Sequence, residues 1–127
     1  MIDSAVLSWT LTMPAGSQLQ RNFSFTVPGT GAAYNTTSLT WEYVARPSAT
    51  DLTVPPLISV TTTPNSQGVI TVLSTTATPQ LLLTLNPAAT VNVTPQQLFH
   101  TLWSGQGTSS AFTWVSGNLI IVGNPQP

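Results

Sequence analysis

Apolar and polar residues alternate along most of this chain, and this period of two constrains the fold more than any other feature. Near the N-terminus Leu7, Trp9, Leu11 and Met13 alternate with serine and threonine. Successive side chains of a β-strand point to opposite faces, so this pattern is typical of strands with one buried face. No helical heptad is visible. The chain is therefore expected to fold mainly as β-structure.

The alternating stretches are separated by turn signals rich in proline, glycine, asparagine and serine. They predict strands at residues 7–13, 19–27, 39–46, 57–63, 69–74, 81–85, 98–104, 112–115 and 118–122. A hairpin-length connection, residues 64–68, joins the fourth strand to the fifth, and Ser116-Gly117 separates the last two. We expect a helical turn within residues 91–97. Eight or nine short strands at this spacing predict an all-β sandwich or barrel.

The length of 127 residues predicts one domain. We assign residues 1–122 to a single β-sandwich domain and residues 123–127 to a C-terminal tail. The N-terminus lacks the basic region of a secretory signal. The longest aliphatic runs are too short to span a bilayer, so we expect no membrane partner.

Charged side chains are scarce, at 4% of the chain against about 25% in an ordinary soluble domain. The five are Asp3, Arg21, Glu42, Arg46 and Asp51. Such a composition argues against disorder, which usually needs high charge, and against nucleic-acid binding, because two arginines neutralise few phosphates. It also leaves few groups for acid–base catalysis, and the absence of cysteine excludes disulfides and thiolate metal sites. We expect no enzyme activity, cofactor or metal.

Low net charge favours association, and the polar surface must here consist mainly of threonine, serine, asparagine and glutamine. This predicts a homo-oligomer or a multi-copy assembly, and the alternative is an ordinary β domain with a neutral surface. No charged residue follows Asp51. We therefore expect the early strands to face solvent or a polar partner, and the neutral remainder to supply the core and the subunit contacts.

The order of several stretches resembles a family of small phage virion domains. The matching stretches are a polar–aromatic strand (residues 18–25), Leu-Thr-Trp-Glu-Tyr-Val-Ala-Arg (39–46), a strand preceded by glycine (68–72), a leucine-rich strand (81–85), an aromatic–aliphatic strand (99–103), a Gly/Ser turn (105–110) and a closing pair of strands with a glycine between them (112–122). The family comprises the immunoglobulin-like β-sandwich modules at the N-terminus of baseplate upper proteins and in short stand-alone virion proteins. Its members often carry Asp in the strand that matches 99–103, where this chain has His100 and Thr101. The resemblance implies an immunoglobulin-like β-sandwich of about eight or nine short antiparallel strands and a location in the virion, and it brings no catalytic residues.

Two opposite charges lie on one predicted strand. Glu42 and Arg46 share a face but lie about 13 Å apart along it, too far to pair directly. Glu42 can instead meet Arg21, and Arg46 can meet Asp51, if the fold brings them together. One interpretation is a docking ion pair to a neighbouring subunit. We favour the other, a surface salt bridge that contributes about 0–1 kcal/mol.

The single histidine is the next candidate. Alternation places His100 on one face with Leu98 and Leu102, opposite Phe99 and Trp103. A catalytic base needs a nucleophile and an orienting acid nearby, and a metal site needs several ligands. We therefore expect a half-buried histidine that is hydrogen-bonded to the backbone.

Tryptophan supplies the remaining candidates. Trp41, Trp103 and Trp114 can form a stacking platform for a sugar or peptide, because aromatic faces bind such ligands. In a carbohydrate- or receptor-binding module, Trp103, Trp114 or Tyr34 would be the platform. Core packing is the simpler account, since Trp41, Trp103 and Trp114 all alternate within strands. Trp9 lies near the N-terminus, where a strand can be donated to a neighbouring chain.

Together these features predict a non-enzymatic bacteriophage virion structural protein. It is expected to pack against other virion proteins, as a capsid decoration or minor capsid protein or as a tail or baseplate component. The alternative is a carbohydrate- or receptor-binding β-sandwich module.

Overall fold

The computed structural model describes residues 7–24, 40–48, 50, 53, 55–74, 80–104 and 112–123. Nine strands and one 3-10 turn lie in these segments. In chain order they are β1 (Leu7–Ser8), β2 (Leu11–Pro14), β3 (Leu19–Ser24), β4 (Trp41–Arg46), β5 (Ile58–Thr61), β6 (Gly68–Ser74), β7 (Gln80–Leu85), η1 (Pro87–Ala89), β8 (Gln96–Ser104) and β9 (Phe112–Val122).

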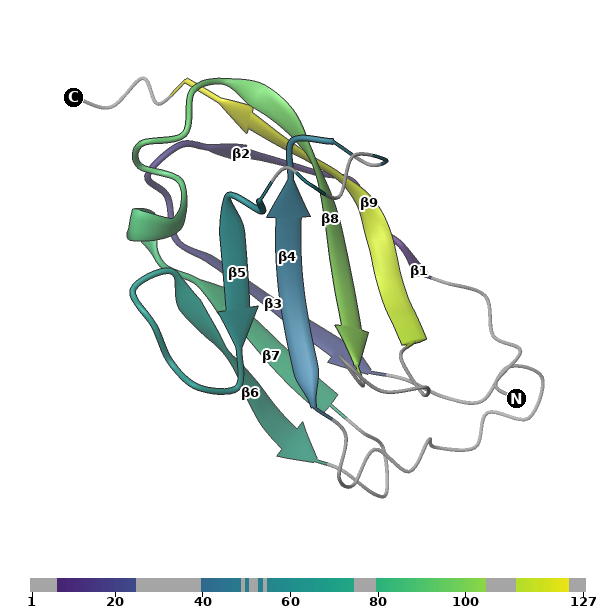
Figure 1. Cartoon of the computed structure of the whole chain (residues 1–127). Coiled ribbons are helices and arrows are strands. Elements are labelled where there is room, and N and C mark those ends of the chain that lie inside the picture. Colours follow the sequence, from purple (N-terminus) through teal and green to yellow (C-terminus); the bar gives the residue numbers. More distant parts are fainter. Residues whose placement is uncertain are drawn as a thin grey trace.

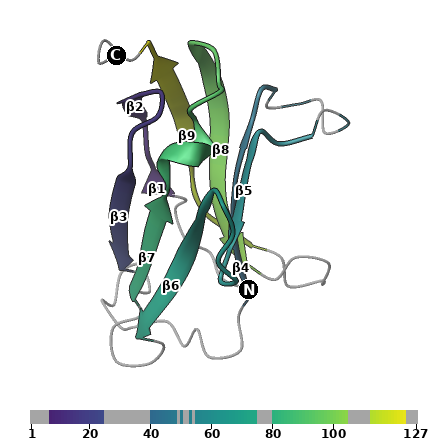
Figure 2. The same cartoon turned by 90° about the vertical axis from the view of Figure 1, so that its left-hand side faces the viewer.

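The strands form two sheets that pack face to face (Figures 1 and 2). Sheet A has the order β9-β8-β4-β5, and both β1 and β2 pair with the free side of β9. Sheet B has the order β3-β7-β6. β3, β7 and β6 match the B, E and D strands of an immunoglobulin-like sandwich, and β4, β8 and β9 match its C, F and G strands. The first strands, β1 and β2, pair with β9 instead of with β3. The predicted fold class is confirmed.

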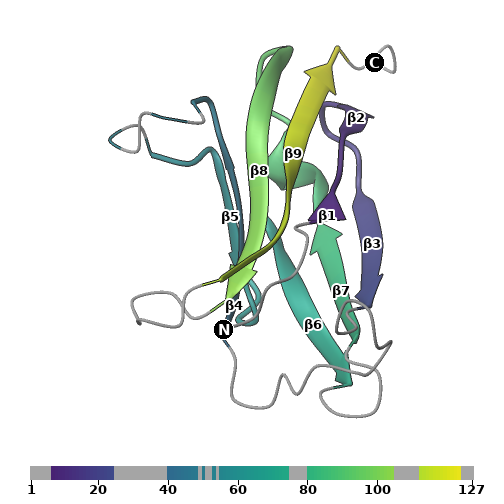
Figure 3. The same cartoon turned by 90° about the vertical axis from the view of Figure 1, so that its right-hand side faces the viewer.

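The N-terminal strands depart from the antiparallel rule. β1 and β2 run parallel to β9, whereas every other strand pair is antiparallel (Figure 3). The predicted strand over 7–13 is divided at Trp9 and Thr10 because β1 and β2 meet β9 on either side of Gly117. Alternation is a local pattern, so it could not predict that these strands pair in parallel with β9.

The last two predicted strands are one. β9 continues through Ser116 and Gly117, so the predicted break there is wrong. The irregularity lies earlier, where the register with β8 shifts and Trp114 is the extra residue. Both Trp114 and Val115 are consequently buried, as expected when a bulge interrupts the alternation.

The connection after β5 crosses between the sheets instead of closing a hairpin, because β5 lies in sheet A and β6 in sheet B. The Gln67 side chain fixes this crossing: its Oε1 accepts from the Ser59 N–H and its Nε2 donates to the Leu57 carbonyl, both at 2.9 Å. Gly68 has φ of +152°, and a Cβ there would lie 2.0 Å from the Thr84 carbonyl oxygen. The chain therefore turns into sheet B at a residue that must be glycine.

The helical turn also lies earlier than predicted. It occupies Pro87–Ala89 instead of residues 91–97, with proline at its first position, where a missing N–H has no consequence. Thr90, directly after this turn, is buried and its Oγ1 accepts from the Gly16 N–H at 2.9 Å. The turn thus joins the loop before β8 to the loop between β2 and β3.

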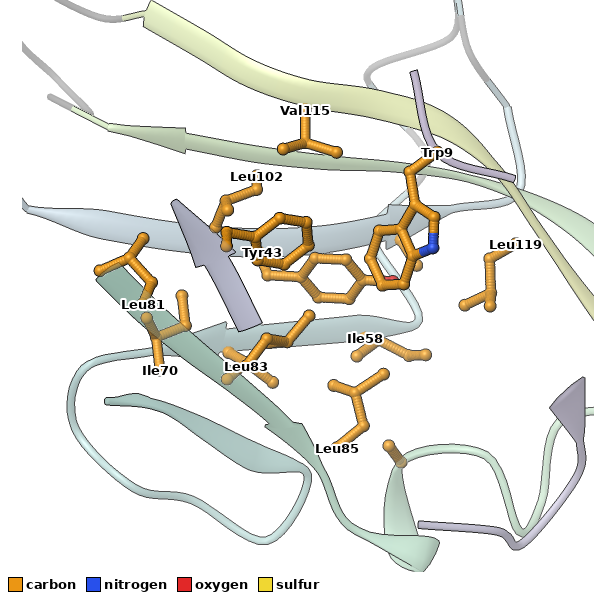
Figure 4. Close-up of a cluster of buried hydrophobic side chains, with 14 of the residues drawn as sticks. Trp9, Tyr43, Ile58, Ile70, Leu81, Leu83, Leu85, Leu102, Val115 and Leu119 are labelled. Carbon is orange, nitrogen blue, oxygen red and sulfur yellow. The ribbon is translucent and has the colours of Figure 1, made fainter. Parts of the chain in front are cut away.

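The core lies between the two sheets (Figure 4). Sheet B contributes leucines and an isoleucine from β7 and β6, while Tyr43, Leu102, Val115 and Leu119 project from sheet A. Trp9 and the β4 residue Tyr43 belong to this core although they precede residue 52. The expectation that the neutral C-terminal part supplies the core is therefore only half correct, since both parts do.

Candidate functional site

His100 is sealed inside the sandwich. Its side chain is 1% exposed, and both ring nitrogens are hydrogen-bonded. A carbonyl oxygen only accepts, so Nε2 carries the proton and donates to the Trp9 carbonyl at 2.6 Å. Nδ1 then accepts from the Tyr43 hydroxyl at 2.9 Å. The predicted bond to backbone is confirmed, and the side chain is fully buried where half-burial was expected.

This arrangement favours the neutral imidazole. Burial lowers the pKa of His100, and the hydrogen bond to the Trp9 carbonyl only partly opposes that effect. Burial likewise raises the pKa of the Tyr43 hydroxyl, so it remains a donor. Neither ring nitrogen of His100 is available to take a proton from a substrate.

A glycine makes the histidine site possible. Gly117 lies directly opposite His100 in the β8–β9 ladder, and a Cβ there would lie 2.0 Å from the Trp9 carbonyl oxygen. Without a side chain at 117, the Trp9 backbone approaches β9 and donates its N–H to the Ser116 carbonyl at 2.9 Å. The Trp9 ring then stacks on the imidazole, with centroids 4.7 Å apart and planes 25° apart.

Arg21 lies at the rim of this cluster, as its position on an apolar strand face predicts. It is exposed, and its guanidinium carbon lies 5.6 Å from the Trp9 ring centroid and 5.5 Å from that of Phe23. These are cation–π distances. The structure therefore places Arg21 over aromatic rings and not beside Glu42, and Asp51 lies outside the described residues.

Glu42 and Arg46 lie together on the outer face of sheet A, which we define as the side turned away from sheet B. Over residues 41–45 and 98–104 the inward side chains are buried, and over residues 42–46 and 99–103 the outward ones are half-buried with one exception. That exception, Val44, is 5% exposed yet is not part of the core cluster. It lies between Ser59 and Thr101 on the neighbouring strands. The centre of the outer face is thus a small, closely covered apolar residue.

A shallow pocket of about 400 Å³ opens on the same outer face. Its lining side chains include Arg46, Phe99, Thr101, Ser116 and Asn118. Hydroxyl, amide, guanidinium and aromatic groups are present, and no carboxylate is. Such a lining can bind polar or aromatic groups, but it holds no acid–base pair.

The tryptophans do not form one platform. Trp9 and Trp114 are buried in the core, and the Trp114 Nε1–H donates to Ser104 Oγ at 2.8 Å. Trp103 is half-buried on the outer face, and its Nε1 has no hydrogen-bond partner among the described residues. Tyr34 lies outside the described residues. Of the three predicted interface tryptophans, only Trp103 therefore belongs to the surface.

Sequence reasoning missed the neighbours that give Glu42 and Arg46 their surroundings. Trp103 lies directly opposite Glu42, and Phe99 lies directly opposite Arg46. The alternation in the sequence already places Phe99 and Trp103 on one side of their strand. Only the register between strands reveals that this side adjoins the two charges.

Within the described segments, no three histidine, cysteine, aspartate or glutamate residues gather to hold a metal ion. The same segments contain no helix of sufficient length and hydropathy to cross a membrane.

No protein-family model and no curated protein sequence matches this chain. Among solved structures, the chain is similar to a family 123 glycoside hydrolase from Clostridium perfringens, with a TM-score of 0.41 and 8% sequence identity. The superposition covers 98% of this chain and 24% of the hydrolase chain. A likeness this weak supports no argument about shared activity.

Proposed function

We propose that this chain is a non-enzymatic structural protein of a bacteriophage virion. It packs against other virion proteins, on the capsid surface or in the tail and baseplate. The observation that carries the proposal is the outer face of sheet A, where aromatic, hydroxyl and apolar side chains surround one acid and one base. A surface of this kind is suited to burial against protein, because little charge has to be desolvated.

The strand edges add to this proposal. β3 and β6 end sheet B, and β5 ends sheet A on one side. On β6, Val72 and Leu73 are exposed, at 38% and 49%. Edge strands offer unpaired backbone groups, and adding a strand to such an edge is a common assembly mode.

The histidine geometry supports a non-enzymatic role, because both nitrogens of His100 are occupied by bonds within the core. The resemblance of residues 18–122 to phage sandwich domains supports the virion setting. The carbohydrate-binding alternative required several exposed aromatic rings together, and burial of Trp114 leaves Trp103 without that partner.

Quantitative mass spectrometry of purified phage particles tests the proposal. We expect the chain in a fixed multi-copy ratio to the major capsid protein after density-gradient purification. Its absence from particles would refute the proposal. A glycan array provides the second arm, since binding that is lost in Trp103→Ala would favour the carbohydrate-binding module instead.

A further inference from the structure

The outward side chains of β4 and β8 form three cross-strand rows. The rows are Glu42 with Trp103, Val44 with Thr101, and Arg46 with Phe99. The first and third rows each contain one charged side chain and one aromatic ring, and their charges are opposite. The central row is uncharged.

This arrangement is self-complementary. Consider a second copy placed face to face, related by a two-fold axis that lies between the copies, crosses the strands and passes at the level of Val44. Each strand then faces its own copy running the other way. Glu42 faces Arg46 of the second copy, and Trp103 faces Phe99 of the second copy. We infer that the outer face of sheet A is a homodimer interface whose occupant is a second copy of this chain.

The pocket on the outer face lies opposite Trp103 of the second copy in this arrangement. It surrounds the Arg46–Phe99 row and extends to Thr101 and Asn118. The two-fold axis brings Trp103 of the second copy over this row, so each copy inserts one indole ring into the other's pocket. An aromatic ring beside a guanidinium is a favourable contact, and tryptophan is enriched among residues that dominate binding energy.

Glu42 and Arg46 strengthen the dimer even though neither residue is unpaired in the single chain. Glu42 and Arg46 already make contacts within their own chain. In the dimer each also meets one opposite charge of the second copy, and the two-fold axis makes this Glu42–Arg46 pair occur twice. Shifting one copy by two residues along the strands would separate both pairs, so the charges set the register.

The available area fits a weak dimer. The face spans β5, β4, β8 and β9, about 19 Å at the usual strand spacing, and the nine residues of β8 span about 30 Å. Two such faces bury on the order of 1,100 Å² together, near the lower limit for specific interfaces. We therefore expect reversible dimerisation in the micromolar range that weakens as salt is added.

Charge exchange in the isolated chain tests the interface, with sedimentation velocity over a concentration series as the readout. Glu42→Arg and Arg46→Glu each place like charges opposite one another, and each should raise the dissociation constant by about tenfold or more. The double variant, Glu42→Arg with Arg46→Glu, restores opposite pairs and should return the constant to near the wild-type value. Arg21→Glu makes the same charge change at the rim of the core, away from the outer face, and should leave the constant unchanged. Near-UV circular dichroism checks that each variant is folded.

The inference is overturned if the wild-type chain stays monomeric at every concentration, or if the double variant dimerises no better than the single ones. It is also overturned if Arg21→Glu has the same effect as Arg46→Glu. Salt dependence of the wild-type dimer requires no variant, and a constant that does not change with salt contradicts the paired charges. This dimer deepens the assembly role proposed above. Its failure would leave the virion proposal intact, since that proposal is tested on particles.

Discussion

Acidification should destabilise this protein through His100. The chain has no other histidine, so His100 dominates any proton uptake between about pH 5 and 7. Its pKa is lowered in the folded chain by burial, while the unfolded chain titrates near 6.5. As the pH falls through 6.5, the unfolded state therefore binds the proton first. Stability is complete above about pH 7 and is lost below 6.5, until the lowered folded pKa is reached.

The size of the effect follows from one proton. The free energy of unfolding should fall by up to about 1.4 kcal/mol per pH unit in this window. With a urea slope of about 1–3 kcal/mol per molar, the unfolding midpoint moves by about 0.5–1.4 M per pH unit. Protonation of Nδ1 would also remove the acceptor for the Tyr43 hydroxyl.

Urea titrations followed by tryptophan fluorescence at several pH values measure this. His100→Gln is the matched control, because an amide can both donate and accept but does not titrate in this range. Both proteins contain the same carboxylates, so the difference between the two curves isolates His100. Parallel curves for wild type and variant, or a wild-type stability that rises on acidification, would refute the lowered pKa of the buried His100.

Three further results are expected. Gly117→Ala should destabilise the fold by about 3 kcal/mol or more, because the new Cβ overlaps the Trp9 carbonyl and disrupts the hydrogen bonds of the Trp9 N–H and carbonyl. Gly123 has no atom within 4 Å of a Cβ placed there, so Gly123→Ala should change the urea midpoint little. Equal midpoints for the two alanine variants would contradict the close approach. Trp114→Phe should cost about 1–2 kcal/mol more in urea unfolding than Trp103→Phe, since only the Trp114 N–H has a described acceptor. The reverse order would show that the Trp103 N–H is satisfied. Tyr43→Phe should lower stability by about 1–3 kcal/mol at pH 7.5, because Nδ1 of the histidine loses its donor, and an unchanged midpoint would argue against that bond.

Local pattern was sufficient to predict much of the fold. Alternation placed His100 on the same face as Leu98 and Leu102, and it placed Glu42 and Arg46 together, because side-chain direction in a strand depends only on the sequence position. The immunoglobulin-like class followed from strand number and spacing together with the resemblance. These features are set within single strands or between neighbouring ones.

Apart from the misplaced helical turn, the errors concern contacts between distant segments. The crossing between β5 and β6 was taken for a hairpin because loop length does not specify which sheet the next strand joins. Gly117 was read as a break, although its role is to admit the Trp9 backbone, which lies about a hundred residues earlier in the chain. Likewise, the pairing of Glu42 with Trp103 and of Arg46 with Phe99 depends on strand register. No pattern within a strand encodes such neighbours.

The most direct test of the central claim is a cryo-electron microscopy reconstruction of the phage particle that we propose to contain this sandwich. We predict many symmetry-related copies, each with the outer face of sheet A buried against protein. A particle without the chain, or one in which this face points into solvent in every copy, would contradict the account.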